Sequence, residues 1–340
     1  MSLATLAAGQ VDPWLATGCS HYDPRHMGSH TGSEHWLVDE GVDAAVAAAP
    51  IARMAVSTPH GPLVSSLLHA SSGGRLWMVS SRRSAHVRVI GRRPDVGIVL
   101  RSGLRSVVIA GTAQVLGPWG PREALRLSVD ARGATQAVLE YAVRNSARLA
   151  GYIADMVRIP PKPETLPFDR VLIAVTPQRG FVATGATVSH LYGDWPGDPE
   201  ALPLWRSGGG RLKQARPELP QGIPPWVASI VDGRQACTIG WDDGEGPLAL
   251  PGTWDPGTWG AELAPSVVGL VAPRPRVAPA CLALDRSVAF RPSSYSGLVL
   301  RGRGRLEAPA EDGGSLRLAL ATERVSWWSG FDKGTVRAQR

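Results

Sequence analysis

Cysteine is scarce in this 340-residue chain, and long apolar runs are missing. Its three cysteines, Cys19, Cys237 and Cys281, lie far apart and are odd in number, so neither a disulfide framework nor a cysteine zinc motif is indicated. No run of 18 apolar residues occurs, which argues against a transmembrane helix, and the N-terminus lacks the basic start of a secretory signal. These absences predict a cytoplasmic protein without a membrane partner.

The sequence motifs of several common enzyme classes are also missing. There is no Gly-x-Ser-x-Gly elbow, no phosphate-binding P-loop, no dinucleotide fingerprint and no His-Glu-x-x-His zinc motif. Nucleophilic hydrolysis and nucleotide-driven chemistry therefore have no support. If the protein is an enzyme, we expect a cofactor to carry the difficult step while the protein orients it.

Lysine is nearly absent, although the chain is basic. Only Lys162, Lys213 and Lys333 are lysines among 36 basic residues, and the formal net charge is +7. The arginines are spread along the chain and no zinc-finger or RNA-binding motif occurs, so a nucleic-acid partner is not indicated. We expect an anionic small molecule as the ligand instead.

The chain contains a candidate internal repeat. Residues 56–79 realign without a gap on residues 228–251, which lie 172 positions later. The alignment places Gly61 on Gly233, Gly74 on Gly246 and Leu76 on Leu248. A repeat this long is a whole domain rather than a solenoid unit, and 340 residues fit about two domains. A site between two such copies would resemble the interface of a homodimer.

Short apolar and β-branched runs between turn residues predict strands in both halves. The predicted strands are 51–57, 63–70, 76–80, 96–101, 107–116 and a pair within 171–182, then 227–239, 248–250, 267–271, 281–290, 298–306 and 316–328. Helices are predicted after a capping box at Thr31, within 84–93, and over 121–156 with a break near Gly133. Strand meanders of this kind close into small barrels.

We therefore expect a mainly β protein with helices (α+β) and two tandem barrels. The expected parts are an N-terminal arm and helix (1–50), a first barrel (51–194) with a helical insertion (121–156), a linker rich in proline and glycine (195–225), a second barrel (226–331) and a tail (332–340). Residues 322–325 correspond to 177–180 at an offset of only 145, so the inserted helices have no counterpart in the second copy. Alternating Arg301, Arg303 and Arg305 predict a solvent-facing edge strand.

The segment from Leu76 to Val96 carries a more specific pattern. A strand ends in hydroxyl residues, a short turn and a basic helix follow, and Arg92-Arg93-Pro94 stops the helix. In this it resembles the flavin-binding split β-barrel family, which includes pyridoxamine 5'-phosphate oxidase and the deazaflavin-dependent reductases. The resemblance covers residues 51–185 well and 226–331 weakly. It implies two split β-barrels that form a pseudo-dimer within one chain. The protein would then be a monomer or a homodimer of such chains.

The resemblance also implies a cofactor and a reaction. The cofactor would be FMN or a deazaflavin, and the protein an oxidoreductase that acts on a small organic substrate at the junction of the barrels. Two alternatives are a cofactor-binding protein without turnover and a haem-binding split barrel. The histidine-rich stretch formed by His21, His26, His30 and His35 is the feature that raises haem or metal, although glycine and proline deny these residues a common helix face, and no metal site is predicted.

Phosphate chemistry points to one group of residues. A phosphate needs hydroxyl, N–H and guanidinium donors that converge at the end of a strand. The predicted cofactor-binding residues are His69, Ser80, Ser81, Arg82, Arg83, Ser84, His86 and Arg88. The alternative is a solvated basic face. The family's oxidase branch has basic residues where this chain has Val64, His69, Ala85 and His86, so pyridoxamine phosphate oxidation itself is not expected.

The second copy contributes aromatic residues rather than basic ones. Its segment aligned with the phosphate-binding turn, residues 251–259, has no basic residue, so one site per chain is expected. Trp241, Trp254 and Trp259 are predicted to wall that site by stacking on the cofactor or substrate, with core packing as the alternative. No catalytic residue is assigned, because spacing does not distinguish the candidate proton donors His60, His69 and His86.

Overall fold

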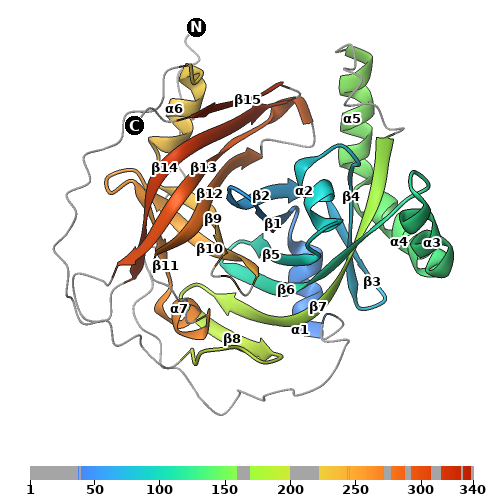
Figure 1. Ribbon diagram of the computed structural model, residues 1–340, viewed down its shortest axis with the longest axis horizontal. Helices are drawn as coiled ribbons and strands as arrows, with labels where there is room; N and C mark the ends of the chain where they lie inside the picture. The colour runs from blue at the N-terminus through green and yellow to red at the C-terminus, as the bar shows by residue number, and fades with distance from the viewer. Residues whose placement is uncertain are drawn as a thin grey trace, which may run out of the picture.

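Two antiparallel barrels lie side by side in the computed structural model (Figure 1). The structure describes residues 37, 40–158, 169–199, 222–242, 244, 246–271, 277–287, 292–307, 315–330 and 332–337. The histidine-rich stretch, most of the predicted arm and most of the predicted linker lie outside these residues. Among the described residues no helix is long and apolar enough to cross a membrane.

The first barrel is an eight-stranded sheet in which β2-β1-β5-β6-β7-β4-β3 are successive neighbours and β8 pairs with β7. The strands are β1 (Ala52–Thr58), β2 (Gly61–Leu67), β3 (His69–Ser72), β4 (Arg75–Ser81), β5 (Asp95–Ser102), β6 (Arg105–Leu116), β7 (Arg170–Thr184) and β8 (Thr187–Tyr192). The helices before and between them are α1 (Glu40–Ala48), α2 (Ala85–Ile90), α3 (Pro121–Val129), α4 (Ala131–Arg144) and α5 (Ser146–Arg158). Glycine-containing turns separate several of these strands, which is why the sequence predicts them well.

The second barrel repeats this order. Its strands are β9 (Gln235–Asp242), β10 (Pro247–Asp255), β11 (Gly260–Leu263), β12 (Val277–Ser287), β13 (Tyr295–Glu307), β14 (Leu316–Ser329) and β15 (Asp332–Arg337), with α6 (Pro225–Val231), α7 (Pro265–Val271) and the short helix η6 (Pro292–Ser294). The order β10-β9-β12-β13-β14-β11 matches β2-β1-β5-β6-β7-β4, and pairing of β11 with β14 closes the second barrel. The predicted fold class, two tandem split β-barrels, is confirmed.

A β-bulge lies at the same place in both barrels. The register of β6 and β7 skips Gln178, and the register of β13 and β14 skips Glu323. Beside each bulge stands a glycine, Gly111 or Gly302, whose Cβ would collide with a main-chain carbonyl of the neighbouring strand. The two bulges lie 145 positions apart, so the predicted match of residues 322–325 with residues 177–180 is correct. The strand pair predicted within 171–182 is instead one strand, because β7 runs through Pro177 without a turn.

The register of the proposed repeat near the start of each barrel is wrong. Gly61 begins β2 after the β1–β2 turn, and the matching turn before β10 contains Gly246, not Gly233. Both Gly61 and Gly246 have positive φ, 87° and 136°, which favours glycine there. The counterpart of the β4–α2 turn is accordingly the β11–α7 turn, and residues 251–259 instead lie in β10 and the turn to β11.

Two predicted strands of the second half are partly or wholly helical. Residues 227–239 begin in α6 and continue as β9 after a turn at Asp232, and residues 267–271 belong to α7. All five residues from Val267 to Val271 are buried, so the run lacks the periodicity that separates a helix from a strand. The absence of inserted helices in the second copy agrees with the short connection from Glu307 to Leu316.

The inserted helices pack on one side of the first barrel. Figure 1 shows α3 and α4 at the outer side of the barrel and α5 extending away from it. The break between α3 and α4 falls at Asp130, whereas Gly133 lies inside α4. Asp155 of α5 accepts a hydrogen bond from the backbone N–H of Ser293 in η6 (2.9 Å), so α5 also reaches the second barrel.

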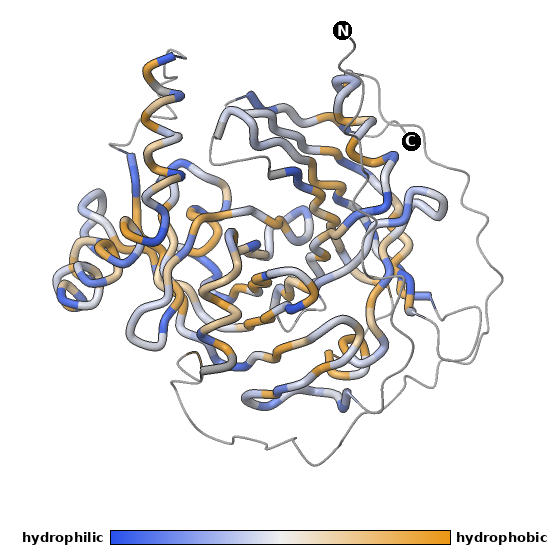
Figure 2. The backbone as a smooth tube through the Cα atoms, turned by 180° about the vertical axis from the view of Figure 1, so that it is seen from behind, coloured by the Kyte–Doolittle hydropathy of each residue, from blue (hydrophilic) through white to orange (hydrophobic). Residues whose placement is uncertain are grey.

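The junction between the barrels is apolar and tightly packed. Strands β1, β2 and β5 contact β9, β10 and β12, and one hydrophobic core contains Val64, Val99 and Phe181 together with the interior of the second barrel. Figure 2 shows apolar segments along the inner strands of both barrels. A Cβ on Gly97 would lie 2.5 Å from main-chain atoms of β10, so the two backbones approach there as closely as they can.

The predicted arginine edge is wrong in part. β13 lies between β12 and β14, not at an edge. Arg301 is 8% exposed and donates hydrogen bonds to the Thr58 hydroxyl (2.7 Å) and the Gly61 carbonyl (3.1 Å) of the first barrel. Arg305 pairs with Glu307 (2.7 Å). Arg301 thus fastens the two barrels together.

Candidate functional site

The β4–α2 turn presents the predicted phosphate-binding residues at one end of the first barrel. Gly73 and Gly74, both with positive φ, make the turn into β4, and Pro94 follows α2. Between β4 and α2, the backbone N–H of Ser84 donates to the carbonyl of Ser81 (3.0 Å). This tight turn leaves Arg82 and Arg83 exposed at its tip.

Ser81, Arg82 and Arg83 already hold a carboxylate. The Arg82 Nε contacts Asp169 Oδ1, the Arg83 Nε lies 3.3 Å from Oδ2, and the Ser81 hydroxyl donates to Oδ2 at 3.2 Å. The Asp169 side chain is 15% exposed, whereas those of Arg82 and Arg83 are 42% and 64% exposed. Three donors from consecutive residues converge on one oxyanion. We call these donor groups the anion site.

Aromatic side chains border the anion site. The Arg82 guanidinium lies 5.0 Å from the centre of the Trp119 ring, and the Trp119 indole N–H donates to the Arg170 carbonyl (3.1 Å). Arg170 in turn donates to the Tyr152 hydroxyl of α5 (3.2 Å). These contacts link the anion site to the start of β7 and to α5.

Ser80, Ser84 and His86 form a second group beside the anion site. The His86 Nε2 lies 2.7 Å from the Ser80 hydroxyl and 3.1 Å from the Ser84 hydroxyl, which are 3.2 Å apart. Burial lowers the pKa of His86 to about 4. The imidazole is therefore neutral at pH 7 and holds the two hydroxyl groups rather than adding a positive charge.

His69 and Arg88 lie apart from both groups. The His69 Nε2 is 3.0 Å from the Ala49 carbonyl oxygen, and burial together with the charge of Arg144 lowers the pKa of His69 to about 3. Arg88 is exposed in the last turn of α2. Three of the eight predicted residues thus share the anion site, three form the neutral group, and for His69 a structural role under α1 fits the contacts.

The three tryptophans predicted as a wall lie inside the second barrel. Trp241, Trp254 and Trp259 expose at most 2% of their surface. Trp254 donates to the Val231 carbonyl (2.8 Å) and meets Trp259 edge to face at 5.2 Å, and Trp241 packs on Gly304 of β13. Strand alternation places Trp241 of β9 and Trp254 of β10 on the inner face, and Trp259 lies in the turn between β10 and β11, so the core-packing alternative fits the contacts of all three.

A polar cluster that the sequence analysis missed lies at the junction. The Asp285 carboxylate pairs with Arg53 (2.6 Å) and accepts hydrogen bonds from the Ser66 hydroxyl (2.9 Å) and the Tyr295 hydroxyl (2.8 Å). Burial would raise the pKa of Asp285, but the charge and hydrogen bonds of Arg53 outweigh it and hold that pKa below its usual value. Trp328 packs near Tyr295, with ring centres 5.9 Å apart. Tyr295 thus belongs to a polar cluster that contains residues of both barrels.

Solved proteins with similar barrels include flavin-binding ones. No protein-family model matches the chain, and no curated protein does. A pyridoxamine 5'-phosphate oxidase-related, FMN-binding protein from Nostoc punctiforme is 14% identical, with a TM-score of 0.32 and coverage of 45% of this chain and 87% of that chain. A conserved hypothetical protein from Mycobacterium tuberculosis is 15% identical (TM-score 0.31; 46% and 91% covered), and an F420 reductase is 19% identical (TM-score 0.26; 42% and 96% covered).

The chain is similar to split β-barrel proteins. Each of these likenesses covers less than half of the chain, so none describes two barrels in one polypeptide. At these TM-scores they carry no argument about ligands or activity, which must come from the residues of this chain.

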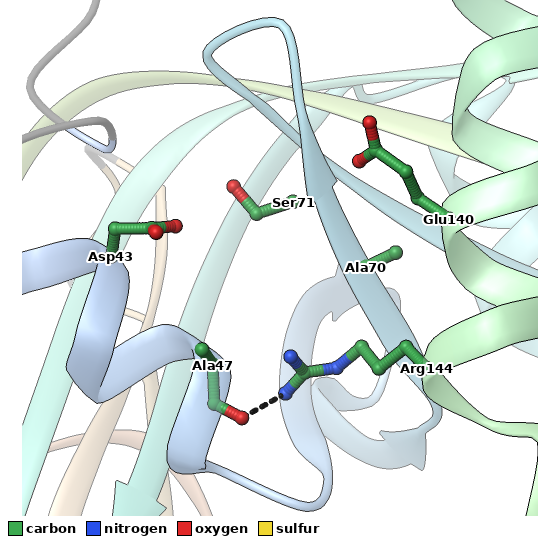
Figure 3. A pocket seen from close by; sticks show the side chains of 6 residues that line it. All are labelled: Asp43, Ala47, Ala70, Ser71, Glu140 and Arg144. Atoms are coloured by element: carbon green, nitrogen blue, oxygen red, sulfur yellow. Dashed lines mark hydrogen bonds between the residues drawn. The ribbon is translucent and has the colours of Figure 1, made fainter.

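A separate pocket of about 210 Å³ lies between α1, β3 and α4 (Figure 3). Asp43, Glu140, Ser71 and Arg144 contribute polar groups to its lining, and Arg144 donates to the Ala47 carbonyl (2.8 Å) at the end of α1. Two carboxylates disfavour a phosphate there. Within the described residues no group of three or more His, Cys, Asp or Glu side chains could hold a metal ion.

The buried histidines predict a specific pH dependence of stability. An unfolded histidine has a pKa near 6.5, whereas the folded pKa values of His69 and His86 are about 3 and about 4. Unfolding therefore takes up protons below about pH 6.5, and stability falls as the pH drops towards the folded values, by about 1.4 kcal/mol per pH unit for each histidine. Between pH 6 and pH 5, H86Q should reduce the slope of the unfolding free energy against pH by the contribution of about one proton. Urea unfolding at each pH measures this slope. H190Q, which replaces an exposed histidine, is the control, and an unchanged slope in H86Q would contradict the prediction.

Proposed function

We propose that the first barrel binds the phosphate of FMN or of a deazaflavin at the anion site. The observation that carries the proposal is the bound carboxylate of Asp169. Ser81, Arg82 and Arg83 hold an oxyanion through two guanidinium groups and a hydroxyl, which are donors that suit a phosphate group. The donors therefore fit the phosphate of such a cofactor.

We propose further that the protein is an oxidoreductase acting on a small organic substrate. A bound flavin or deazaflavin would supply hydride transfer, which no side chain can perform. The roles of the chain's own residues would be to bind the phosphate through the anion site, to border it with Trp119, and to hold the turn in shape through His86. His69 and His86 are neutral at pH 7, so neither is assigned as a proton donor.

The second barrel lacks the residues for such a site, so we expect one site per chain. The counterpart of the β4–α2 turn is the connection from β11 to α7, which consists of Ala264 and leads into Pro265 and Ser266 at the start of α7. No basic residue stands there, so an anion would find no guanidinium group. A stoichiometry of one cofactor per chain follows from this difference between the barrels.

Removing the two arginines of the anion site tests the proposal. R82A/R83A should weaken FMN or F420 binding about 100-fold, because two charge-assisted hydrogen bonds are lost at about 1.5 kcal/mol or more each. R92A/R93A removes the same charge from an exposed pair a few residues away and should leave affinity nearly unchanged. Affinity is measured by fluorescence titration of each cofactor with the purified protein. Equal losses in both double variants would contradict a specific site and indicate a general effect of charge.

The absorption spectrum separates the alternatives. A flavin or deazaflavin band that is retained by the wild type and lost in R82A/R83A supports the proposed site. A Soret band would indicate a haem-binding split barrel instead. Cofactor binding without turnover of any reductant or electron acceptor would indicate a carrier protein. A colourless protein that takes up neither cofactor on reconstitution would refute the proposal.

A further inference from the structure

Asp169 occupies the donors that the proposed function needs. The Nε atoms of both arginines and the Ser81 hydroxyl point at its carboxylate, so a second oxyanion cannot use these atoms while Asp169 does. We propose that Asp169 is a built-in competitor of the cofactor phosphate: the carboxylate closes the anion site until a phosphate displaces it. This inference rests on the proposed function and names how that site is regulated.

Electrostatics decides between competition and assistance. A carboxylate that merely oriented the arginines would remain beside the phosphate, and two anions a few ångströms apart repel strongly in a partly buried site. The Asp169 side chain is largely buried, so water screens this repulsion poorly. The two anions therefore exclude each other, and the carboxylate must leave when a phosphate enters.

The geometry lets the carboxylate leave without unfolding the turn. The backbone N–H of Arg82 donates to the main-chain carbonyl of Asp169 (3.0 Å), so the backbone of residue 169 stays paired with the turn while its side chain rotates. The arginines are 42% and 64% exposed, which leaves their outer N–H groups open to an incoming phosphate. A phosphate can thus bind first to the outer N–H groups and then replace the carboxylate.

The sequence position of Asp169 explains why it is missed by motif analysis. It lies 86 to 88 residues beyond the anion site, directly before β7, and reaches the turn because β7 pairs with β4. In this pairing Ser81 is opposite Arg170. The neighbour of Arg170 therefore stands at the end of β4, where the anion site begins.

Neutralising Asp169 tests the inference with three probes. D169N keeps the size of the side chain and removes its charge. We expect FMN to bind D169N about tenfold or more tightly than it binds the wild type. Riboflavin, which lacks the phosphate, should bind both proteins equally. Inorganic phosphate should compete with FMN at a lower concentration in D169N than in the wild type. Affinities are measured by fluorescence titration of the full chain.

D130N is the matched control. Asp130 pairs with Arg75 on the same barrel, and its replacement makes the same change in net charge away from the anion site. D169A repeats the test should the asparagine make new hydrogen bonds, and circular dichroism checks that each variant is folded. Binding of FMN to the wild type without a gain in D169N and D169A, or an equal gain for riboflavin, would overturn the inference. Failure of FMN, F420 and phosphate to bind any of these proteins would instead refute the proposed function.

Discussion

Replacing Asp285 with asparagine is expected to lower the free energy of unfolding by about 3–5 kcal/mol. The carboxylate is 4% exposed, and it neutralises Arg53 and accepts hydrogen bonds from Ser66 and Tyr295. D285N leaves the guanidinium group of Arg53 at a largely dry junction without a counter-charge, and the desolvation of an unpaired charge costs much free energy. Since the four residues come from both barrels, the loss weakens the junction in particular.

Urea unfolding followed by circular dichroism measures this loss. E262Q is the control, because Glu262 pairs with Arg234 at the surface (2.7 Å; side chains 31% and 46% exposed) and exposed pairs contribute at most about 1 kcal/mol. The double variant R53M/D285L should recover much of the loss, since apolar residues of similar size remove both charges together. A change below about 1 kcal/mol in D285N would show that water reaches Arg53 and that the junction is not dry.

Replacing Gly97 with valine is the second change for which we expect a large effect. A Cβ at this position of β5 would lie 2.5 Å from the backbone nitrogen of Ala249 and from the carbonyl oxygen of Pro247, both in β10. Backbone atoms cannot rotate away as a side chain can, so the two barrels must move apart. We expect a loss of at least about 3 kcal/mol, the upper part of the range for overpacked cores.

Valine separates the steric effect from an effect on strand formation. Because valine favours strands, it would stabilise β5 if space were available. The control is G233A, since a Cβ on Gly233 meets nothing within 4 Å. Thermal unfolding followed by circular dichroism should show a marked fall in Tm for G97V and almost none for G233A. A G97V protein as stable as the wild type would mean that β5 and β10 do not pack backbone to backbone.

The sequence predicts the first barrel better than the second, and the reason is local. In the first barrel, strands end at turns such as Gly73-Gly74, so composition marks their limits. In the second barrel, all five residues from Val267 to Val271 of α7 are buried, so this short apolar run carries no amphipathic pattern and predicts a strand instead of a helix. The bulge at Glu323 could be matched to Gln178 because the residues around it are similar, whereas the match near Gly233 rested on glycines that occur in many turns.

The candidate site shows the same division between local and distant contacts. The donors of the anion site are consecutive in sequence, so their convergence could be predicted. Asp169 could not, because only the pairing of β7 with β4 brings it to the turn. Nor could the burial of Trp254, since the face on which a strand residue lies depends on the register of β10 and β11, nor that of Trp259, which lies in the turn between these strands. Exposure of such residues is a tertiary property that composition does not encode.

The packing at Gly97 has a consequence for how such a chain can evolve. Carrying the paired registers outward from the two bulges makes Gly97 of β5 equivalent to Cys281 of β12. A homodimer must use one sequence on both sides of its two-fold axis, so a glycine required on one side is imposed on the other. Here Gly97 lies against β10, while Cys281 lies beside Gly240 and Val64. Two barrels in one chain are free of this symmetry, so each barrel can complement its partner rather than a copy of itself.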